Sequence, residues 1–189
     1  WYAPSLADPA EASVADWETQ HVVDLLKTGV SARGSALGPM AEVVFRSTQY
    51  LSDADLRAMA LFLKSLPQSA PRATRDPVPL AQGTAERGRA VYREHCEGCH
   101  GPQGEGARGA YPALAGNRSV VMDPPANAIR AVLSGGFQPA TAGNPRPWGM
   151  PPFGHVLDDA DTAAVVSFIR TQWGNRAAPV SATDVQRMR

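Results

Sequence analysis

The sequence contains little cysteine, no long apolar segment and no net charge. Only two cysteines occur in 189 residues, so a disulfide-rich scaffold is excluded. No apolar run approaches the roughly 20 residues that a membrane-spanning helix needs. The 18 basic residues balance the 18 acidic ones without forming a basic block, so we expect no nucleic-acid partner. The 17 prolines and 17 glycines predict short helices joined by many turns.

Both cysteines belong to one motif, Cys96-Glu97-Gly98-Cys99-His100. This Cys-x-x-Cys-His pattern is the attachment signature of c-type haem, in which two thiols form thioethers with the vinyl groups and the histidine ligates the iron. A thioredoxin-like redox pair would follow a strand, and no strand pattern precedes the motif. A zinc site needs a second ligand pair, and the other histidines are scattered. The motif therefore favours haem c, with zinc or a disulfide as alternatives.

Covalent haem also indicates where the protein resides. Thioether attachment is typical of the bacterial periplasm or an equivalent oxidising space, so we expect a periplasmic protein. The chain begins at Trp1 rather than at a methionine. From this we expect that a leader or a longer upstream segment has been removed.

Five segments show helical spacing of apolar residues and predict an all-α fold. They are 16–28, 52–66, 84–96, 127–133 and 158–173. The polar, proline-rich stretch 68–79 predicts a semi-rigid linker between two domains. We therefore expect an organisation in four parts: a partial domain (1–67), the linker (68–79), a complete domain (80–174) and a polar C-terminal tail (175–189).

The two predicted domains resemble each other. The run Leu51-Ser52-Asp53-Ala54-Asp55 aligns with Leu157-Asp158-Asp159-Ala160-Asp161 at an offset of 106 residues, and Gly29 aligns with Gly135 at the same offset. Matches in the same order predict two copies of one fold unit. Transferred to the first copy, the Cys-x-x-Cys-His motif would fall about eight residues before the first residue. We expect the first unit to lack its haem-attachment half; the alternative is that it never bound haem.

A second axial ligand is expected for an electron-carrying haem, usually a methionine sulfur. Met150 follows His100 by 50 residues and stands between a glycine and two prolines, which shape the backbone near a ligand loop. We favour Met150 as the ligand, against the alternative that it packs on Trp148. Met40 is the corresponding candidate in the first copy.

The haem motif and its neighbouring helices resemble class I cytochrome c domains. The resemblance rests on Gly88 and Tyr92 before the motif and on Phe168 and Trp173 in the last helix. It implies that a proline carbonyl accepts a hydrogen bond from the haem histidine, and Pro112 matches that proline.

A closer resemblance covers nearly the whole chain. Gly38-Pro39-Met40 and Gly149-Met150-Pro151-Pro152 are similar to segments in the second and third domains of triple-haem cytochrome c subunits of membrane-associated bacterial dehydrogenases. It implies an electron-transfer subunit that passes electrons from a dehydrogenase catalytic subunit to quinone or a terminal oxidase. It also implies a place at the outer face of the inner membrane, reached through partners. One Cys-x-x-Cys-His is present, so the resemblance does not fix the haem count.

An enzymatic role is the competing hypothesis. No acid–base or nucleophile constellation accompanies the haem motif, so we expect no catalytic residues in this chain. The alternative is a haem enzyme, a peroxidase or a sulfur-compound dehydrogenase, whose distal position is open or unusual. Met150 would not ligate the iron in such an enzyme.

Overall fold

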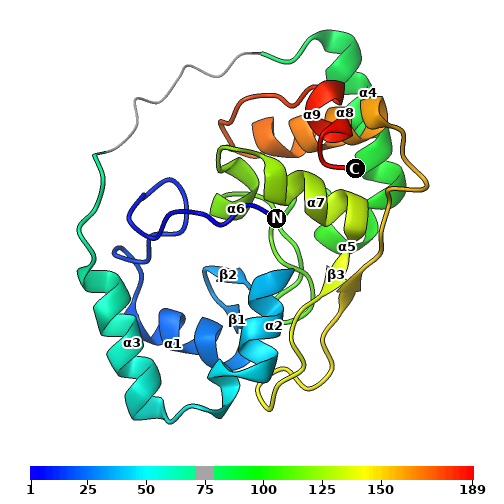
Figure 1. Ribbon diagram of the computed structural model, residues 1–189. Helices are drawn as coiled ribbons and strands as arrows, with labels where there is room; N and C mark the ends of the chain where they lie inside the picture. The colour runs from blue at the N-terminus through cyan, green and yellow to red at the C-terminus, as the bar shows by residue number, and fades with distance from the viewer. Residues whose placement is uncertain (71–78) are drawn as a thin grey trace. The chain divides into compact units, whose positions relative to one another are not determined.

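The computed structural model describes residues 1–70 and 79–189 and is largely helical (Figure 1). Within these residues the chain divides into two compact units, which are described separately. Unit 1 holds Trp1 with residues 3–70 and 136–149, and unit 2 holds Tyr2 with residues 79–135 and 150–189. The predicted all-α class is confirmed. Most of the predicted linker, 71–78, lies outside the described residues.

Unit 1 is organised around two packed helices. Its helical elements are α1 (Thr19–Thr28), α2 (Pro39–Arg46), the 3-10 turn η1 (Thr48–Tyr50) and α3 (Asp53–Ser65). A two-residue antiparallel pair, β1 (Val30–Ser31) and β2 (Gly34–Ser35), follows α1. The core forms where Val22, Val23 and Leu26 of α1 pack with Leu56 and Ala60 of α3.

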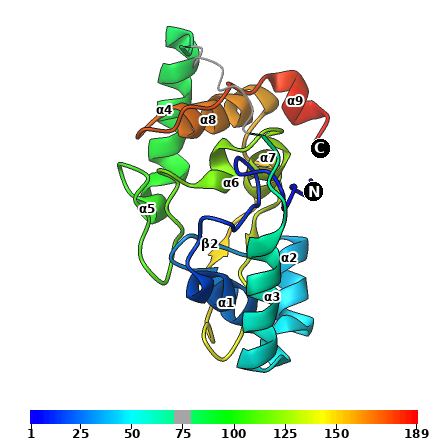
Figure 2. The same ribbon diagram turned by 90° about the vertical axis from the view of Figure 1, so that its left-hand side faces the viewer.

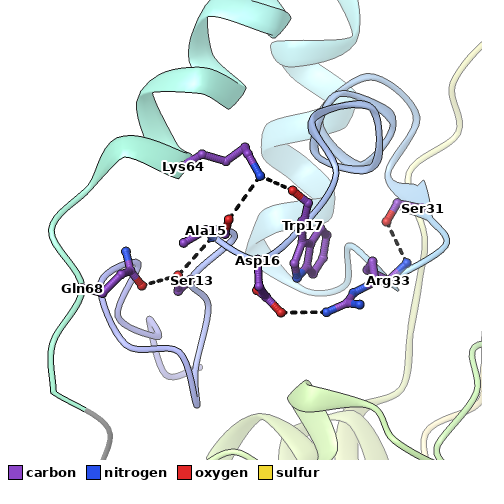
Figure 3. A network of polar contacts seen from close by, with 8 residues as sticks. All are labelled: Ser13, Ala15, Asp16, Trp17, Ser31, Arg33, Lys64 and Gln68. Carbon is purple, nitrogen blue, oxygen red and sulfur yellow. Dashed lines mark hydrogen bonds and ion pairs between the residues drawn. The ribbon is translucent and has the colours of Figure 1, made fainter.

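Lys64, near the end of α3, ties that helix to the segment before α1 (Figure 3). Its ammonium group donates hydrogen bonds to the carbonyl oxygens of Ala15, at 3.2 Å, and Trp17. Between these residues, Asp16 accepts a hydrogen bond from the Arg33 guanidinium at 2.9 Å. The two Lys64 bonds satisfy backbone carbonyls that the irregular segment before α1 leaves without helical partners.

Unit 2 carries the haem motif directly after its first helix. Its helices are α4 (Gln82–His95), α5 (Glu97–His100), α6 (Arg118–Val121), α7 (Ala126–Ser134), α8 (Asp159–Thr171) and α9 (Ala182–Gln186). Two short strands, β3 (Gly136–Phe137) and β4 (Gly149–Met150), pair at the ends of the 136–149 segment; all of their residues except Met150 belong to unit 1. Figure 2 shows α4 crossing α8.

The crossing of α4 and α8 depends on Gly88. A Cβ at this position would overlap the carbonyl oxygen of Ala164 and lie 2.8 Å from Cβ of Phe168. Glycine therefore allows the two backbones to approach closely. One turn later, Tyr92 packs its ring 5.6 Å from Phe168 and 5.0 Å from Trp173, so an aromatic cluster fills the space beside the crossing.

Arg170 repeats in unit 2 the arrangement of Lys64 in unit 1. Its side chain is fully buried on α8, and its guanidinium donates to the carbonyl oxygens of Val120 at 2.7 Å and Met122 at 2.8 Å. Burial lowers the pKa of Arg170, and Asp123, paired at 2.6 Å, partly offsets that shift. Lys64 and Arg170 are 106 residues apart, and each binds the carbonyls of two alternate residues. This correspondence supports the predicted duplication.

The ends of the helices also correspond between the two units. The side chain of Ser52 caps α3 by accepting from the Asp55 amide, and that of Asp158 caps α8 by accepting from the Asp161 amide. After α1 and α7, the backbone turns through glycines with positive φ, 80° at Gly29 and 59° at Gly135.

Two segments differ from the boundaries that the sequence predicts. The tail 175–189 forms α9 and packs on α8, with Val185 fully buried and a capping box between Ser181 and Asp184. The 136–149 loop, assigned from sequence to the second domain, groups with unit 1, where the Thr141 hydroxyl donates to the Thr28 carbonyl at 3.0 Å. In the part of the chain that the structure describes, no helix is long and apolar enough to cross a membrane.

We expect Gly88→Ala to lower the free energy of unfolding by about 3 kcal/mol, because the added methyl group overpacks the α4–α8 crossing. Gly83→Ala, in the same helix but with nothing within 4 Å of its Cβ, is the matched control. It should leave stability unchanged or raise it by up to about 1 kcal/mol. Urea unfolding of the two variants measures the difference, and equal effects would contradict the close helix crossing.

Candidate haem-attachment site

The haem motif occupies the turn that follows α4. Cys96 ends α4 and begins the one-turn helix α5, and its carbonyl accepts hydrogen bonds from the amides of Cys99, at 3.1 Å, and His100, at 2.9 Å. Residues three and four apart on a helical turn share a face, so this turn brings both thiols and the imidazole together. Both thiols are free; Cys96 is buried and Cys99 is exposed. Burial, and secondarily Cys99, raises the pKa of the Cys96 thiol to about 12.

His100 is held in one orientation by the backbone of Pro112. Its side chain is buried, with 9% of its surface exposed, and its Nδ1 lies 3.0 Å from the Pro112 carbonyl oxygen. Burial lowers the pKa of His100, and the bond to Pro112 opposes that shift. A neutral imidazole that donates its Nδ1–H to a carbonyl leaves the lone pair of Nε2 free for a metal. The structure thus brings together His100 and Pro112 as the resemblance implies.

A compact loop, 101–116, closes over the motif. The Gly106 amide donates to the His100 carbonyl at 2.7 Å, and the Leu114 amide donates to the Gly104 carbonyl at 2.7 Å. Gly106 has a φ of +65°, and a Cβ there would lie 2.5 Å from the Tyr111 carbonyl oxygen. The loop can therefore bring Pro112 back to His100 only because position 106 has no side chain.

Two further side chains fix this loop, and the sequence analysis singled out only the first of them. The Tyr92 hydroxyl, whose role as a hydrogen-bond donor the sequence did not indicate, donates to the Gly101 carbonyl at 2.6 Å. Asn175 is buried, and its amide oxygen accepts from the Gly116 amide at 2.9 Å. No local pattern identifies Asn175, because an asparagine after Gly174 is typical of any turn that follows a helix.

Met150 lies in β4 at the edge of the unit 2 core. Its side chain is partly buried and packs against that core. The segment after it is bound to the end of α7, where the amides of Phe153 and Gly154 donate to the carbonyls of Val132 and Leu133, both at 3.0 Å. The backbone that follows Met150 is thus anchored to α7.

Met40 lies in unit 1, in the first turn of α2, with 38% of its surface exposed. The sequence analysis paired it with a haem motif that this chain does not contain. Within residues 1–70 and 79–189, no group of three or more His, Cys, Asp or Glu side chains is placed to hold a metal ion.

Comparison with known proteins finds a family model that matches the region of this site. Residues 85–173, from α4 to just beyond α8, match the family model described as cytochrome c. The whole chain is 38% identical over 198 residues to the cytochrome c subunit of a quinone alcohol dehydrogenase from Gluconobacter oxydans (strain 621H), and it covers 41% of that protein.

Two further relatives are also cytochrome subunits of dehydrogenases. The chain is 30% identical over 215 residues to the fructose dehydrogenase cytochrome subunit of Gluconobacter japonicus, and 34% identical over 198 residues to the gluconate 2-dehydrogenase cytochrome c subunit of Pantoea cypripedii. All of this chain aligns, and it covers 44% and 45% of these proteins. The chain thus spans less than half the length of these relatives. It contains a cytochrome c domain, which implies covalently bound haem c, and it is homologous to the cytochrome c subunits of quinone-linked dehydrogenases.

Proposed function

We propose that this chain transfers electrons through haem c as part of the cytochrome subunit of a dehydrogenase complex. The observation that carries the proposal is the 3.0 Å contact between His100 Nδ1 and the Pro112 carbonyl, one residue after a free Cys-x-x-Cys pair. This contact prepares an imidazole ligand whose tautomer and ring plane are already set. The cytochrome subunits among the relatives support a dehydrogenase partner.

Four residues of unit 2 would hold the cofactor. Cys96 and Cys99 would form the thioethers, and His100 and Met150 would be the axial ligands. Haem c, when bound, supplies a one-electron couple at its iron. The aromatic cluster around Tyr92 and the core beside Met150 surround the site with apolar side chains, and this burial is one way in which a protein tunes the potential of that couple.

The relatives favour an electron carrier over a haem enzyme, because they are named as cytochrome subunits of dehydrogenases. A peroxidase or a sulfur-compound dehydrogenase would need an open or unusual distal position, in which Met150 does not ligate the iron. In the proposed complex, electrons come from the catalytic subunit and leave to quinone or a terminal oxidase. The chain works in the periplasm, at the outer face of the inner membrane, and meets the membrane through its partners.

A second haem in unit 1 is supported by an apolar face on α3. Phe62 and Phe168 are counterparts, 106 residues apart; Phe168 lies against α4 and is 6% exposed, whereas Phe62 is 65% exposed. Ala58 is likewise exposed, and its counterpart Ala164 is buried. We infer that α3 is covered in the full-length protein by a haem-attachment helix equivalent to α4, and that Met40 ligates that haem.

The intact mass of the protein, produced in a host that attaches haem c, should show one haem increment for this chain. Replacing both Cys96 and Cys99 by alanine should abolish the increment and the haem stain of the denatured protein. The matched control is Met59→Ala, which should leave the mass increment in place. If the unmodified protein shows no haem increment in its mass, the motif does not attach haem, and the zinc or disulfide alternative holds.

We expect Met150→Ala to remove the weak far-red absorption band of methionine-ligated ferric haem, while the covalent haem stays. The midpoint potential should fall by more than about 59 mV, which is a tenfold change for a one-electron couple, because thioether sulfur raises the potential. Met122→Ala, at a buried methionine near the end of α6, is the control and should keep the band. Persistence of the band in Met150→Ala would exclude Met150 as the ligand.

Substitutions of two glycines in the 101–116 loop test how His100 is oriented. Gly106 and Gly109 both have positive φ, 65° and 78°, so alanine costs about 1 kcal/mol at either. Only at 106 does the methyl group meet backbone, 2.7 Å from the Pro112 carbonyl carbon, whereas nothing lies within 4 Å at 109. Gly106→Ala should therefore lose about 3 kcal/mol in urea unfolding and shift the midpoint potential. A similar result for Gly109→Ala would show that backbone strain alone is responsible.

A further inference from the structure

We propose that Asn175, beyond the end of α8, is a positioning residue that holds the Pro112 carbonyl against the histidine ligand. The proposal rests on the proposed electron-transfer function, because it concerns the ligand that this function needs. Asn175 stands in the segment that the sequence assigns to a polar tail, yet 5% of its surface is exposed.

Both polar atoms of the Asn175 side chain form hydrogen bonds. The amide oxygen accepts from the Gly116 amide at 2.9 Å. The amide nitrogen donates to the carbonyls of Leu114, at 3.0 Å, and Ile169, at 2.8 Å. The side chain thus binds alternate backbone groups of segment 114–116, much as a neighbouring strand would, and ties them to the last turn of α8.

Segment 114–116 is the far side of a closed ring of contacts that includes His100. From His100, the ring passes through Nδ1 to Pro112, along the chain to Leu114, and by the Leu114 amide to the Gly104 carbonyl. The chain then returns from Gly104 to His100 within one short turn. Because Pro112 is two residues from Leu114, a shift of segment 114–116 moves the acceptor of the histidine bond.

The backbone that leads to Asn175 is strained in a way that serves this placement. Trp173 has a φ of +54°, and Gly174 follows with a φ of +84°, so the chain reverses directly after α8. A non-glycine residue in this region costs about 1–2 kcal/mol and persists only where its surroundings fix it. Here the Trp173 ring packs 5.0 Å from Tyr92 and against Gly104. The end of α8 therefore holds the 101–116 loop at two points, Gly104 and segment 114–116.

The consequence for the haem ligand follows from the chemistry of imidazole. A hydrogen bond from Nδ1 to a carbonyl makes Nε2 more basic, and a more basic ligand favours the ferric state. Loss of the Asn175 bonds would let Pro112 move away from Nδ1, so the His100 Nδ1–H proton would exchange faster with solvent and the midpoint potential would rise.

Ser167 provides a matched control on the same helix. Its hydroxyl is fully buried, donates to the Val180 carbonyl at 3.2 Å and accepts from the Val180 amide at 2.8 Å. Ser167→Ala thus removes buried bonds between α8 and the tail, as Asn175→Ala does, without touching the 101–116 loop. Asn175→Asp is a second test variant, since it keeps the acceptor for Gly116 and loses the donor to Leu114 and Ile169.

The experiment compares Asn175→Ala, Asn175→Asp and Ser167→Ala as holoproteins. We expect the exchange of the His100 Nδ1–H in the ferrous protein, followed by NMR, to be about tenfold faster in both Asn175 variants. Their midpoint potential should rise, and Ser167→Ala should change neither quantity. Should Asn175→Ala not fold, Asn175→Asp and Asn175→Ser decide the result.

Two outcomes overturn the proposal. If the Asn175 variants match Ser167→Ala in proton exchange and potential, Asn175 only stabilises the tail. If the potential changes without any change in Nδ1–H exchange, the effect does not pass through Pro112. Failure of the proposed function is distinguishable, because the unmodified protein would then lack covalent haem or the far-red band before any Asn175 variant is compared.

Discussion

The hydrogen bond between His100 and the Pro112 carbonyl is the contact on which the site depends. An imidazole can offer either nitrogen to a metal, and only a partner on Nδ1 makes Nε2 the available one. The chain satisfies this requirement with a backbone carbonyl, which cannot titrate. The arrangement therefore needs the right loop path more than the right side chain, and the loop 101–116 takes that path because Gly106 lets the backbone pass closely beneath Tyr111 and Pro112.

The same loop is held from outside by the helix crossing. Gly88 lets α4 and α8 approach, and this approach places the end of α8 beside the turn that carries the cysteines. Trp173 and Asn175 then reach the loop from that end. The crossing of α4 and α8 is thus linked to the orientation of the His100 imidazole through the Trp173 ring and the Asn175 amide.

Sequence patterns were informative where chemistry or periodicity is local. The Cys-x-x-Cys-His spacing, the apolar periodicity of α3 and α8, and their caps at Ser52 and Asp158 depend on residues within a few positions of one another. Asn175 could not be found in this way, since its partners in the 101–116 loop lie about 60 residues away and its type suits any turn. Helix α9 was missed for a similar reason: its single fully buried residue, Val185, stands among polar neighbours and has no periodic companions.

A comparison of Lys64 in unit 1 with its counterpart Arg170 in unit 2 explains why the tail belongs to unit 2. Lys64 has three donors and binds two carbonyls, whereas the Arg170 fork also reaches the Ala178 carbonyl at 3.0 Å and Asp123. That extra carbonyl belongs to the tail, which Ser167 binds again at Val180. A tail fixed at 178 and 180 leaves little freedom to residue 175. Arginine at this position thus secures the segment from which Asn175 reaches the histidine loop, and a lysine with fewer donors and no planar fork could not serve all of these acceptors.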